Sequence, residues 1–224
     1  MNAERPDLAP LIDHAQLDPL AGREAISRSC DEARHFGFAG VCVASRWVAH
    51  ARERLPRNAG GVEPRLVAVI GFPFGAVQAV VKRAEAELAA EQGADELDVV
   101  PDFGALSDRD SSTLLADLAA VAEVGLPFKV ILEVGKLTPE ALELLVEVSI
   151  DAGAGFLKTG SGFGPAATAA QVSTLRDLAR GRAAIKASGG IASLDAALEL
   201  VQAGASRLGT SRGVALIEAL KAGA

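Results

Sequence analysis

The 224-residue sequence has few of the residues that mark exported, disulfide-linked or metal-binding proteins. It has two cysteines, Cys30 and Cys42, and it opens with a polar segment that contains proline instead of the charged and apolar parts of a signal peptide. This composition is typical of a cytoplasmic protein in a reducing compartment. Its three histidines, His14, His35 and His50, lie far apart with no cysteine or carboxylate at metal-ligand spacing, so we expect no metal site.

Two further absences concern membranes and nucleic acids. No apolar run approaches the roughly 18 to 20 residues that a membrane-spanning helix needs. The net charge is −7, and the sequence has no long basic run. Binding to nucleic acid or to a membrane surface needs clustered lysine and arginine, so we expect neither partner. An anionic ligand therefore needs a site that is locally positive.

A repeated pattern of helix and strand indicates the fold. Amphipathic segments end at glycines such as Gly37 and Gly93, and short β-rich runs follow within a few residues. Glycine is the expected residue just after a helix, where the backbone adopts a positive φ. About eight such strands, spaced roughly 25 to 30 residues apart, predict a single-domain (β/α)8 TIM barrel of the α/β class over residues 1–224.

The expected elements alternate along the whole chain. The expected strands are Leu8–Asp13, Ala39–Val43, Arg65–Ile70, Glu96–Val100, Phe128–Leu132, Phe156–Lys158, Ala183–Lys186 and Arg207–Gly209. The expected helices are Arg23–His35, Arg46–Leu55, Ala79–Glu91, Ser111–Val124, Pro139–Ala152, Ala167–Arg180, Ser193–Ala203 and Gly213–Lys221. The alternative is a doubly wound open sheet, which has a glycine-rich dinucleotide turn after its first strand. Residues 11–17 contain no glycine, so the barrel is favoured.

Ionisable residues at the strand ends are the candidate catalytic residues. In a (β/α)8 barrel, the chemistry gathers where the strands lead into the following loops. Asp98, Lys158 and Lys186 lie at such strand ends among apolar neighbours, where an unpartnered charge is costly. We therefore expect the three side chains to face one another at the barrel mouth. A purely structural ion pair between the aspartate and a lysine is the alternative interpretation.

Two neighbouring lysines have a specific chemical use. A free lysine has a pKa of about 10.4, so only about one amine in a few thousand is nucleophilic at neutral pH. A second ammonium at about 4 Å disfavours the charged form by about 4 kcal/mol before screening, at an effective dielectric constant of about 20. Lysine beside another cation is a route to a Schiff-base nucleophile, for which Asp98 can relay protons through water.

Glycine-rich turns after the last two strands indicate an anion site. Gly189 and Gly190 follow the seventh strand, and Gly209 and Ser211 follow the eighth, in each case just ahead of a helix. Exposed N–H groups and the helix dipole favour phosphate at such positions. Ordinary turn chemistry is the alternative for either turn alone, and the occurrence of two on adjacent strands favours phosphate.

Other acidic residues near strand ends are expected to have supporting roles. Glu133 is expected to face the barrel mouth and to form ion pairs there. Asp95 and Glu96 are expected to cap or solvate the turn that precedes the fourth strand.

Several short motifs occur in an order and at a spacing that are specific to one family. They are Ile12-Asp13-His14, Val41-Cys42-Val43, the segments Val69–Gly75, Gly93–Val100 and Lys129–Glu133, Lys158-Thr159, and the segments Lys186–Ile191 and Gly204–Ser211. In these motifs, over most of its length, the sequence resembles the deoxyribose-phosphate aldolases, which are class I aldolases on a (β/α)8 barrel.

The resemblance implies a role for each candidate. Lys158 forms the Schiff base, Lys186 is the cation that favours its free amine, and Asp98 relays protons. The implied substrate and phosphate contacts are Cys42, Thr159, Ser161, Gly162, Gly189, Gly190, Gly209 and Ser211. A small buried apolar side chain is the alternative interpretation of Cys42. The implied reaction is reversible cleavage of 2-deoxy-D-ribose 5-phosphate to D-glyceraldehyde 3-phosphate and acetaldehyde, carried as an enamine without a metal or other cofactor. The family also implies a homo-oligomer.

Five positions depart from the family pattern, and two of them, Gly160 and Ser161, lie in one loop. The family loop Lys-Thr-Ser-Thr-Gly is Lys-Thr-Gly-Ser-Gly here, and the other three changes are threonine to Ala15, asparagine to Asp102 and threonine to Val134. A missing hydrogen bond to substrate can cost about a factor of ten in discrimination, so Ala15 and Gly160 bear on the substrate. Some family members also end in a tyrosine that reaches the site, whereas this chain has no tyrosine.

Three hypotheses follow from these residues. The first is an aldolase for 2-deoxyribose 5-phosphate, and the second is a related Schiff-base aldolase with a different sugar phosphate or aldehyde. The third is a non-catalytic barrel that binds phosphorylated ligands. Retention of both lysines favours the two enzymes over the non-catalytic barrel.

Overall fold

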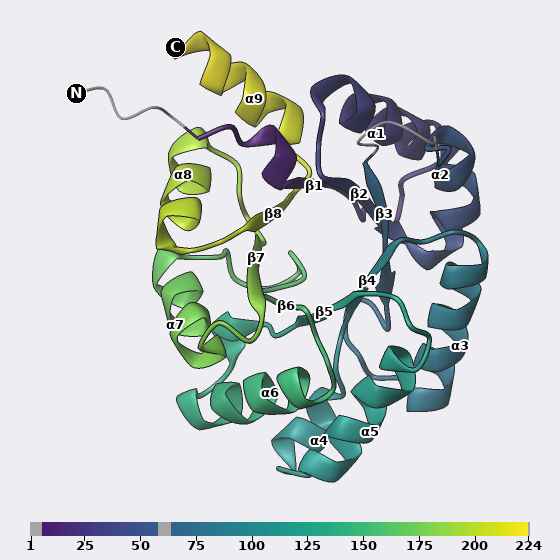
Figure 1. The fold of residues 1–224 in the computed structure, drawn as a ribbon, viewed down its shortest axis with the longest axis vertical. Helices are drawn as coiled ribbons and strands as arrows, with labels where there is room; N and C mark the ends of the chain where they lie inside the picture. Colours follow the sequence, from purple (N-terminus) through teal and green to yellow (C-terminus); the bar gives the residue numbers. More distant parts are fainter. Residues whose placement is uncertain (1–5, 58–63, 224) are drawn as a thin grey trace.

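Eight parallel strands close into a barrel that is surrounded by helices (Figure 1). The computed structural model describes residues 6–57 and 64–223. Each strand pairs with the next one along the chain, and the last pairs with the first. This closed sheet confirms the predicted (β/α)8 barrel and excludes the doubly wound sheet. The strands are β1 Ile12–Gln16, β2 Gly40–Ala44, β3 Arg65–Ile70, β4 Glu96–Val99, β5 Phe128–Ile131, β6 Phe156–Lys158, β7 Ala184–Ser188 and β8 Arg207–Thr210.

At least one helix follows each strand and covers the outside of the barrel (Figure 1). The predicted helix stops are confirmed at Gly37 and Gly204, which adopt φ values of 69° and 118°. The helix expected from Pro139 starts there, and the Thr138 side chain caps it by accepting a hydrogen bond from the Ala141 N–H. The helices are α1 Arg23–Phe36, α2 Val48–Arg54, α3 Ala79–Glu91, α4 Phe103–Ser107, α5 Ser111–Ala122, α6 Pro139–Asp151, α7 Ala169–Ala179, α8 Leu194–Ala203 and α9 Gly213–Ala222.

Two stretches differ from the sequence-based expectation. β1 begins at Ile12 instead of Leu8, because Ala9–Leu11 forms a short 3-10 helix whose proline has no N–H for a strand ladder. The helix α4 is not predicted by the sequence pattern, since it is short and lacks a clear apolar period. Asp102 caps it by accepting hydrogen bonds from the N–H groups of Gly104 and Ala105.

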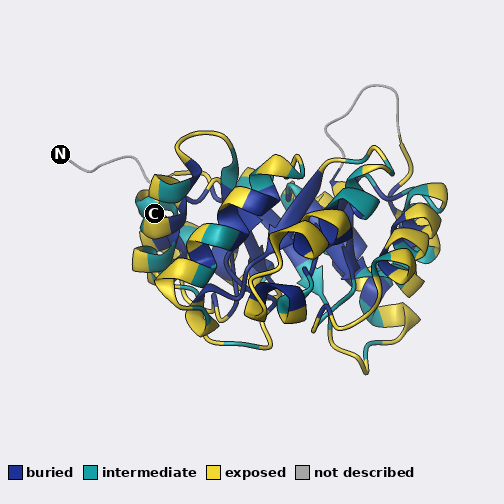
Figure 2. Cartoon of the chain, turned by 90° about the horizontal axis from the view of Figure 1, so that it is seen from below, coloured by how far each residue is buried: buried dark blue, intermediate teal, exposed yellow. Residues whose placement is uncertain are grey.

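The apolar core lies between the strands and the surrounding helices (Figure 2). Successive side chains of a strand point to opposite faces of the sheet. Along β4, Leu97 and Val99 belong to the apolar core, while Glu96 and Asp98 contact lysines inside the barrel. The closed sheet therefore collects charged side chains from several strands in one enclosed space.

Two further expectations concern membrane-spanning helices and the number of domains. None of the described helices is both long enough and apolar enough to cross a membrane. Residues 1–5, 58–63 and 224 lie outside the described residues, so a single domain over residues 1–224 stays a prediction.

Candidate active site

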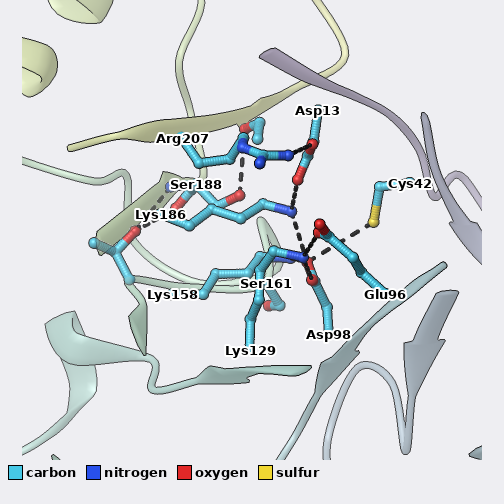
Figure 3. Close-up of polar contacts among 12 residues, drawn as sticks. Asp13, Cys42, Glu96, Asp98, Lys129, Lys158, Ser161, Lys186, Ser188 and Arg207 are labelled. Carbon is cyan, nitrogen blue, oxygen red and sulfur yellow. Dashed lines mark hydrogen bonds and ion pairs between the residues drawn. The ribbon is translucent and has the colours of Figure 1, made fainter. Parts of the chain in front are cut away.

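The barrel brings Lys158, Lys186 and Asp98 together (Figure 3). The Nζ atoms of Lys158 and Lys186 lie 2.9 Å and 2.8 Å from one oxygen, Asp98 Oδ2. Lys158 ends β6 and stands opposite Lys186 of β7 in the register of these parallel strands, so both side chains enter the barrel at the same level. All three side chains are enclosed, with at most 2% of their surface exposed.

Four more charged side chains, which sequence reasoning does not assign to the site, join these three: Asp13 and Lys129 contact them directly, and Arg207 and Glu96 contact Asp13 and Lys129. Lys186 Nζ lies 2.5 Å from Asp13 Oδ2, whose partner oxygen Oδ1 accepts a hydrogen bond from Arg207 at 2.8 Å. Lys129 Nζ lies 3.1 Å from Asp98 Oδ1 and 2.5 Å from Glu96 Oε2 (Figure 3). The charge cluster, as named below, consists of Asp13, Glu96, Asp98, Lys129, Lys158, Lys186 and Arg207.

The alternation of side chains along a strand indicates from the sequence that one of these four residues, Glu96, belongs to the site. Residues two apart on a strand share a face, so Glu96 enters the barrel on the same side of β4 as Asp98. The expectation that Glu96 caps or solvates a turn is therefore wrong, because its buried carboxylate pairs with Lys129. Asp95 does support the turn, since it pairs with Arg52, which donates a hydrogen bond to the Gly93 carbonyl.

Burial and ion pairing act in opposite directions on the charge cluster. Burial favours the neutral form of Asp98, but the neighbouring lysines hold its pKa well below the usual value. Burial likewise opposes ionisation of Asp13, but Lys186 and the other nearby cations lower its pKa to about 2. Burial also acts against the charge on Lys186, yet Asp13 and Asp98 raise its pKa above the usual range. At neutral pH Lys186 is therefore protonated and lies between two ionised carboxylates, those of Asp13 and Asp98.

Asp13→Asn is expected to lower stability in a pH-dependent way. The pKa of Asp13 is about 2 in the folded protein, against 3.8 for an unperturbed aspartate. Its ionised form therefore stabilises the fold above about pH 4. That stabilisation amounts to about 2 kcal/mol and is lost as the pH falls from about 4 to about 2. Urea unfolding from about pH 6 to pH 2 should show the free-energy gap between wild type and variant narrowing by this amount. A gap that does not change with pH contradicts the proposed charge on Asp13.

A cavity of about 500 Å³ opens above the two lysines. Its lining includes Lys158 and Lys186, whereas the fully buried Asp98 lies beneath them and does not line it. Residues of the loops after β6, β7 and β8 form much of the remaining wall. The residues of the implied substrate and phosphate contacts that line the cavity are Cys42, Ser161, Gly162, Gly189, Gly190, Gly209 and Ser211.

Thr159 is the implied contact that does not line the cavity. Its hydroxyl donates to the Ser188 carbonyl and accepts from the Ser188 N–H, each at 2.9 Å. The geometry therefore supports a role for Thr159 in joining β6 to β7 and gives no support to a contact with substrate.

Small residues leave room around Lys186 and the turns. A side chain at Gly209 would collide with Ser188 Oγ and would approach Lys186 Cε to 3.1 Å. Gly190 has a φ of +67°, which favours glycine, and a side chain there would collide with Ala166. Neither position therefore has room for a side chain, and Gly209 lies within β8 at its end next to the cavity.

The thiol of Cys42 lies at the edge of the charge cluster. Its Sγ is 3.9 Å from Asp98 Oδ2, and the side chain packs with Val67 and Val69. Burial raises the pKa of this thiol to about 11, so it is a neutral group at physiological pH. Cys42 thus both lines the cavity and packs as a small buried side chain.

Two of the five departures from the family pattern, Ala15 and Ser161, line the cavity. Ala15 packs against the small apolar cluster that contains Cys42. Asp102 caps α4, which asparagine can also do. Val134 is buried, and a side chain at Gly160 would meet the Ser188 carbonyl at an ordinary 3.5 Å. The question of substrate therefore concerns Ala15 and Ser161.

Histidines and acidic groups of the described segments show no arrangement for metal binding. Within residues 6–57 and 64–223, no group of three or more His, Cys, Asp or Glu is placed to hold a metal ion. His14 Nε2 lies 2.8 Å from Glu32, and His50 Nε2 lies 2.9 Å from Ser27 Oγ. Both histidines therefore take part in local contacts between side chains.

Comparison with known proteins identifies the class and then the family. No protein-family model matches the chain. A deoxyribose-phosphate aldolase from Thermosynechococcus vestitus is 47% identical over 213 residues, which cover 95% of this chain and 96% of that protein. One from a Cyanothece species is 48% identical over 212 residues, with coverages of 94% and 91%. A solved tetrameric structure of deoxyribose phosphate aldolase from Aeropyrum pernix superposes with a TM-score of 0.86 at 32% identity and covers 97% of this chain and 92% of that one.

These similarities agree with the barrel fold. The protein is an aldolase, a lyase that breaks carbon–carbon bonds, and not a non-catalytic barrel. It belongs to the deoxyribose-phosphate aldolase family, with which it shares nearly its whole length.

Proposed function

We propose that this aldolase reversibly cleaves 2-deoxy-D-ribose 5-phosphate into D-glyceraldehyde 3-phosphate and acetaldehyde through a Schiff base on Lys158. The observation that carries the proposal is the contact of both Lys158 and Lys186 with Asp98 Oδ2, directly below a cavity walled by glycine turns. The names of the relatives support the choice of substrate.

Lys158 has the fewest carboxylate contacts among the three lysines of the charge cluster. It contacts one carboxylate, Asp98, whereas Lys129 and Lys186 each contact two. Lys158 also lines the cavity, and Lys129 does not. We therefore assign the nucleophilic amine to Lys158 and the lasting positive charge to Lys186.

The reaction needs an electron sink next to the bond that breaks. The Lys158 amine attacks the C1 aldehyde of the open-chain sugar, and loss of one water leaves a protonated imine. The C3 hydroxyl then loses its proton, the C2–C3 bond breaks, and its electron pair moves into the imine to form an enamine. C3 leaves as the aldehyde of glyceraldehyde 3-phosphate. The enamine takes up a proton at C2, and one water hydrolyses the resulting imine to release acetaldehyde and the free amine.

Asp98 serves this sequence as a fixed carboxylate beneath the reacting nitrogen. Its low pKa makes it a poor store for a proton, so its proposed role is to hold both lysine nitrogens and to pass protons between them and water. Lys186 lines the cavity and touches Asp98 Oδ2, which places it on that route. Both side chains therefore act on the imine and on the departing protons.

The phosphate is proposed to lie at the glycine turns above the lysines. Backbone N–H groups at the starts of α8 and α9 and the hydroxyl groups of the loops favour an anion there. The protein carries a net charge of −7, so this local preference is what attracts a phosphorylated sugar. The proposed phosphate contacts are Ser161, Gly162, Gly189, Gly190, Gly209 and Ser211.

Ala15 favours a second candidate, a Schiff-base aldolase for a different sugar phosphate or aldehyde. It presents a methyl group to the cavity where the family pattern has a hydroxyl. Compared with threonine at this position, Ala15 removes a hydrogen bond from any substrate whose hydroxyl group faces this wall. A substrate without a hydroxyl group there is bound equally well in either case.

A substrate panel separates the two candidates. Release of aldehyde should be measured for 2-deoxyribose 5-phosphate, ribose 5-phosphate and unphosphorylated 2-deoxyribose. We expect kcat/KM for 2-deoxyribose 5-phosphate to exceed the others by at least about tenfold, because only it combines the phosphate with an unsubstituted C2. Equal or faster cleavage of another sugar phosphate supports the second candidate instead.

Two expectations about the whole protein belong to the same proposal. We infer a homo-oligomer, supported by the tetramer described for the aldolase from Aeropyrum pernix, and a cytoplasmic location. Light scattering of the purified protein measures the first. A mass equal to that of one chain at micromolar concentration contradicts it.

A further inference from the structure

Glu133 has an unusual backbone conformation directly after β5. Its φ of 52° and ψ of 47° place it in the left-handed region, which is unfavourable for a residue that carries a Cβ. Its carboxylate is also buried, with 5% of the side chain exposed. A strained backbone and a buried charge at one residue are both unfavourable, so the surrounding structure must depend on this conformation.

The Glu133 carboxylate lies against the loop that follows Lys158, residues 159–168. Its Oε1 accepts a hydrogen bond from the Ser161 N–H at 2.6 Å, and its Oε2 lies 3.3 Å from Lys136 Nζ. A side chain at Gly164 would collide with Oε2, so the loop passes directly over the carboxylate. Glu133 therefore attaches the loop to the end of β5.

The attached part of the loop is the part that lines the cavity. Ser161 and Gly162 belong to the cavity wall above Lys158. Glycines at 160, 162 and 164 give this segment considerable backbone freedom. The Ser161 hydroxyl accepts a hydrogen bond from the Phe163 N–H at 3.1 Å, so the amide held by Glu133 and the turn that forms the wall are next to each other. By holding the Ser161 amide, Glu133 therefore also holds this part of the cavity wall in place.

We propose that Glu133 is a positioning residue that holds Ser161 and Gly162 in the conformation that binds the phosphate end of the substrate. Its described polar contacts are with Ser161 and Lys136, and it acts on the substrate only through the loop. The inference rests on the proposed function, because it takes the ligand of this cavity to be a phosphorylated sugar. Lys136 offsets the negative charge that Glu133 brings close to that phosphate.

Three substitutions separate the hydrogen bond from the charge and from the backbone. Glu133→Gly removes the acceptor and suits the left-handed conformation, Glu133→Asp keeps the charge but shortens the reach, and Glu133→Gln keeps an acceptor oxygen without the charge. We expect the first two to raise KM for 2-deoxyribose 5-phosphate at least about tenfold, with kcat within about threefold of wild type. Glu133→Gln should stay within about threefold in both constants.

Unphosphorylated 2-deoxyribose isolates the role of the loop. Its kcat/KM should change less than about threefold in all three variants, because it lacks the group that the loop binds. Arg180→Gly is the matched backbone control, since the exposed Arg180 has a φ of 50° at the far end of α7 and should leave both substrates unaffected. Hydrogen–deuterium exchange should show faster exchange in residues 159–168 of Glu133→Gly and Glu133→Asp, but not of Glu133→Gln.

The outcomes distinguish this inference from the proposed function. If wild type cleaves 2-deoxyribose 5-phosphate and the Gly and Asp variants keep its KM, Glu133 does not position the loop. Equal losses on both substrates, or a Gln variant as impaired as the Asp variant, overturn it as well. If the Gly variant does not fold, the comparison of Asp with Gln decides alone. Failure of wild type to cleave the phosphorylated sugar instead refutes the proposed function.

Discussion

The Lys158→Met variant is expected to lose aldolase turnover by at least about 10⁴-fold while it keeps its fold. Methionine provides no amine, so the imine and its electron sink cannot form. The fold should persist because methionine has a similar length and because Asp98, the carboxylate that Lys158 contacts, keeps its ion pairs with Lys129 and Lys186.

Turnover and thermal unfolding of the purified variant measure both parts of this prediction. Lys221→Met is the matched control, because Lys221 is exposed near the end of α9 and away from the cavity. The control should keep wild-type turnover. Retention of more than about a hundredth of the activity by Lys158→Met contradicts the assignment of the nucleophile.

Asp98→Asn is expected to impair both stability and catalysis. The carboxylate contacts three lysines, so its conversion to a neutral amide of the same size leaves buried cations without their shared partner. Breaking a buried ion pair by removing one partner costs about 3 to 5 kcal/mol. We also expect turnover to fall at least about 100-fold, because the proton relay beneath Lys158 is lost.

Urea unfolding and steady-state kinetics test this second prediction. Asp177→Asn is a suitable control, since Asp177 is 70% exposed and pairs with Arg176 on the surface, where such pairs contribute little. If the free energy of unfolding of Asp98→Asn lies within about 1 kcal/mol of the wild-type value, the lysines do not depend on this carboxylate.

The structure changes how the two lysines influence each other. From the sequence, Lys186 is expected to be an ammonium that repels the charge on Lys158 directly. In the structure Asp98 lies between the two nitrogens and attracts both, which offsets their repulsion. Lys129 and Arg207 add two cations that also share the carboxylates of the cluster. We therefore attribute the proposed nucleophilic role of Lys158 to the whole charge cluster and not to one pair of lysines.

Local signals predict most of the fold. Glycine after several of the helices and the short apolar runs that follow are enough to place most strands, because both reflect backbone preferences that act over a few residues. The first strand is misplaced by four residues, since Leu8–Leu11 is as apolar as a strand but contains Pro10. The helix α4 escapes prediction because a single cap, Asp102, starts a helix of five residues.

The site is predicted less completely than the fold. Lys158, Lys186 and Asp98 stand out as charges at apolar strand ends. Asp13 and Arg207 meet only because β1 pairs with β8, and that closure joins segments at opposite ends of the sequence. The direction in which a side chain points is a second reason why the sequence predicts the site incompletely.

Two residues illustrate the problem of side-chain direction. The family resemblance implies a substrate or phosphate contact for Thr159, but its hydroxyl bonds to Ser188 of the neighbouring strand. Glu133 has the residue type of an ion-pair partner, and Lys136 is its partner in the structure. Its second contact, with the Ser161 N–H, depends on a left-handed backbone that the sequence does not signal.

Covalent trapping tests the central claim most directly. Wild-type protein is incubated with acetaldehyde and sodium borohydride, digested, and mapped by mass spectrometry. If the imine forms as proposed, borohydride reduces it to an ethyl group on Lys158 Nζ, and inactivation follows the extent of that modification. The Lys158→Met protein should remain unmodified at the site. An ethyl group on Lys186 or Lys129, with Lys158 unmodified, contradicts the account.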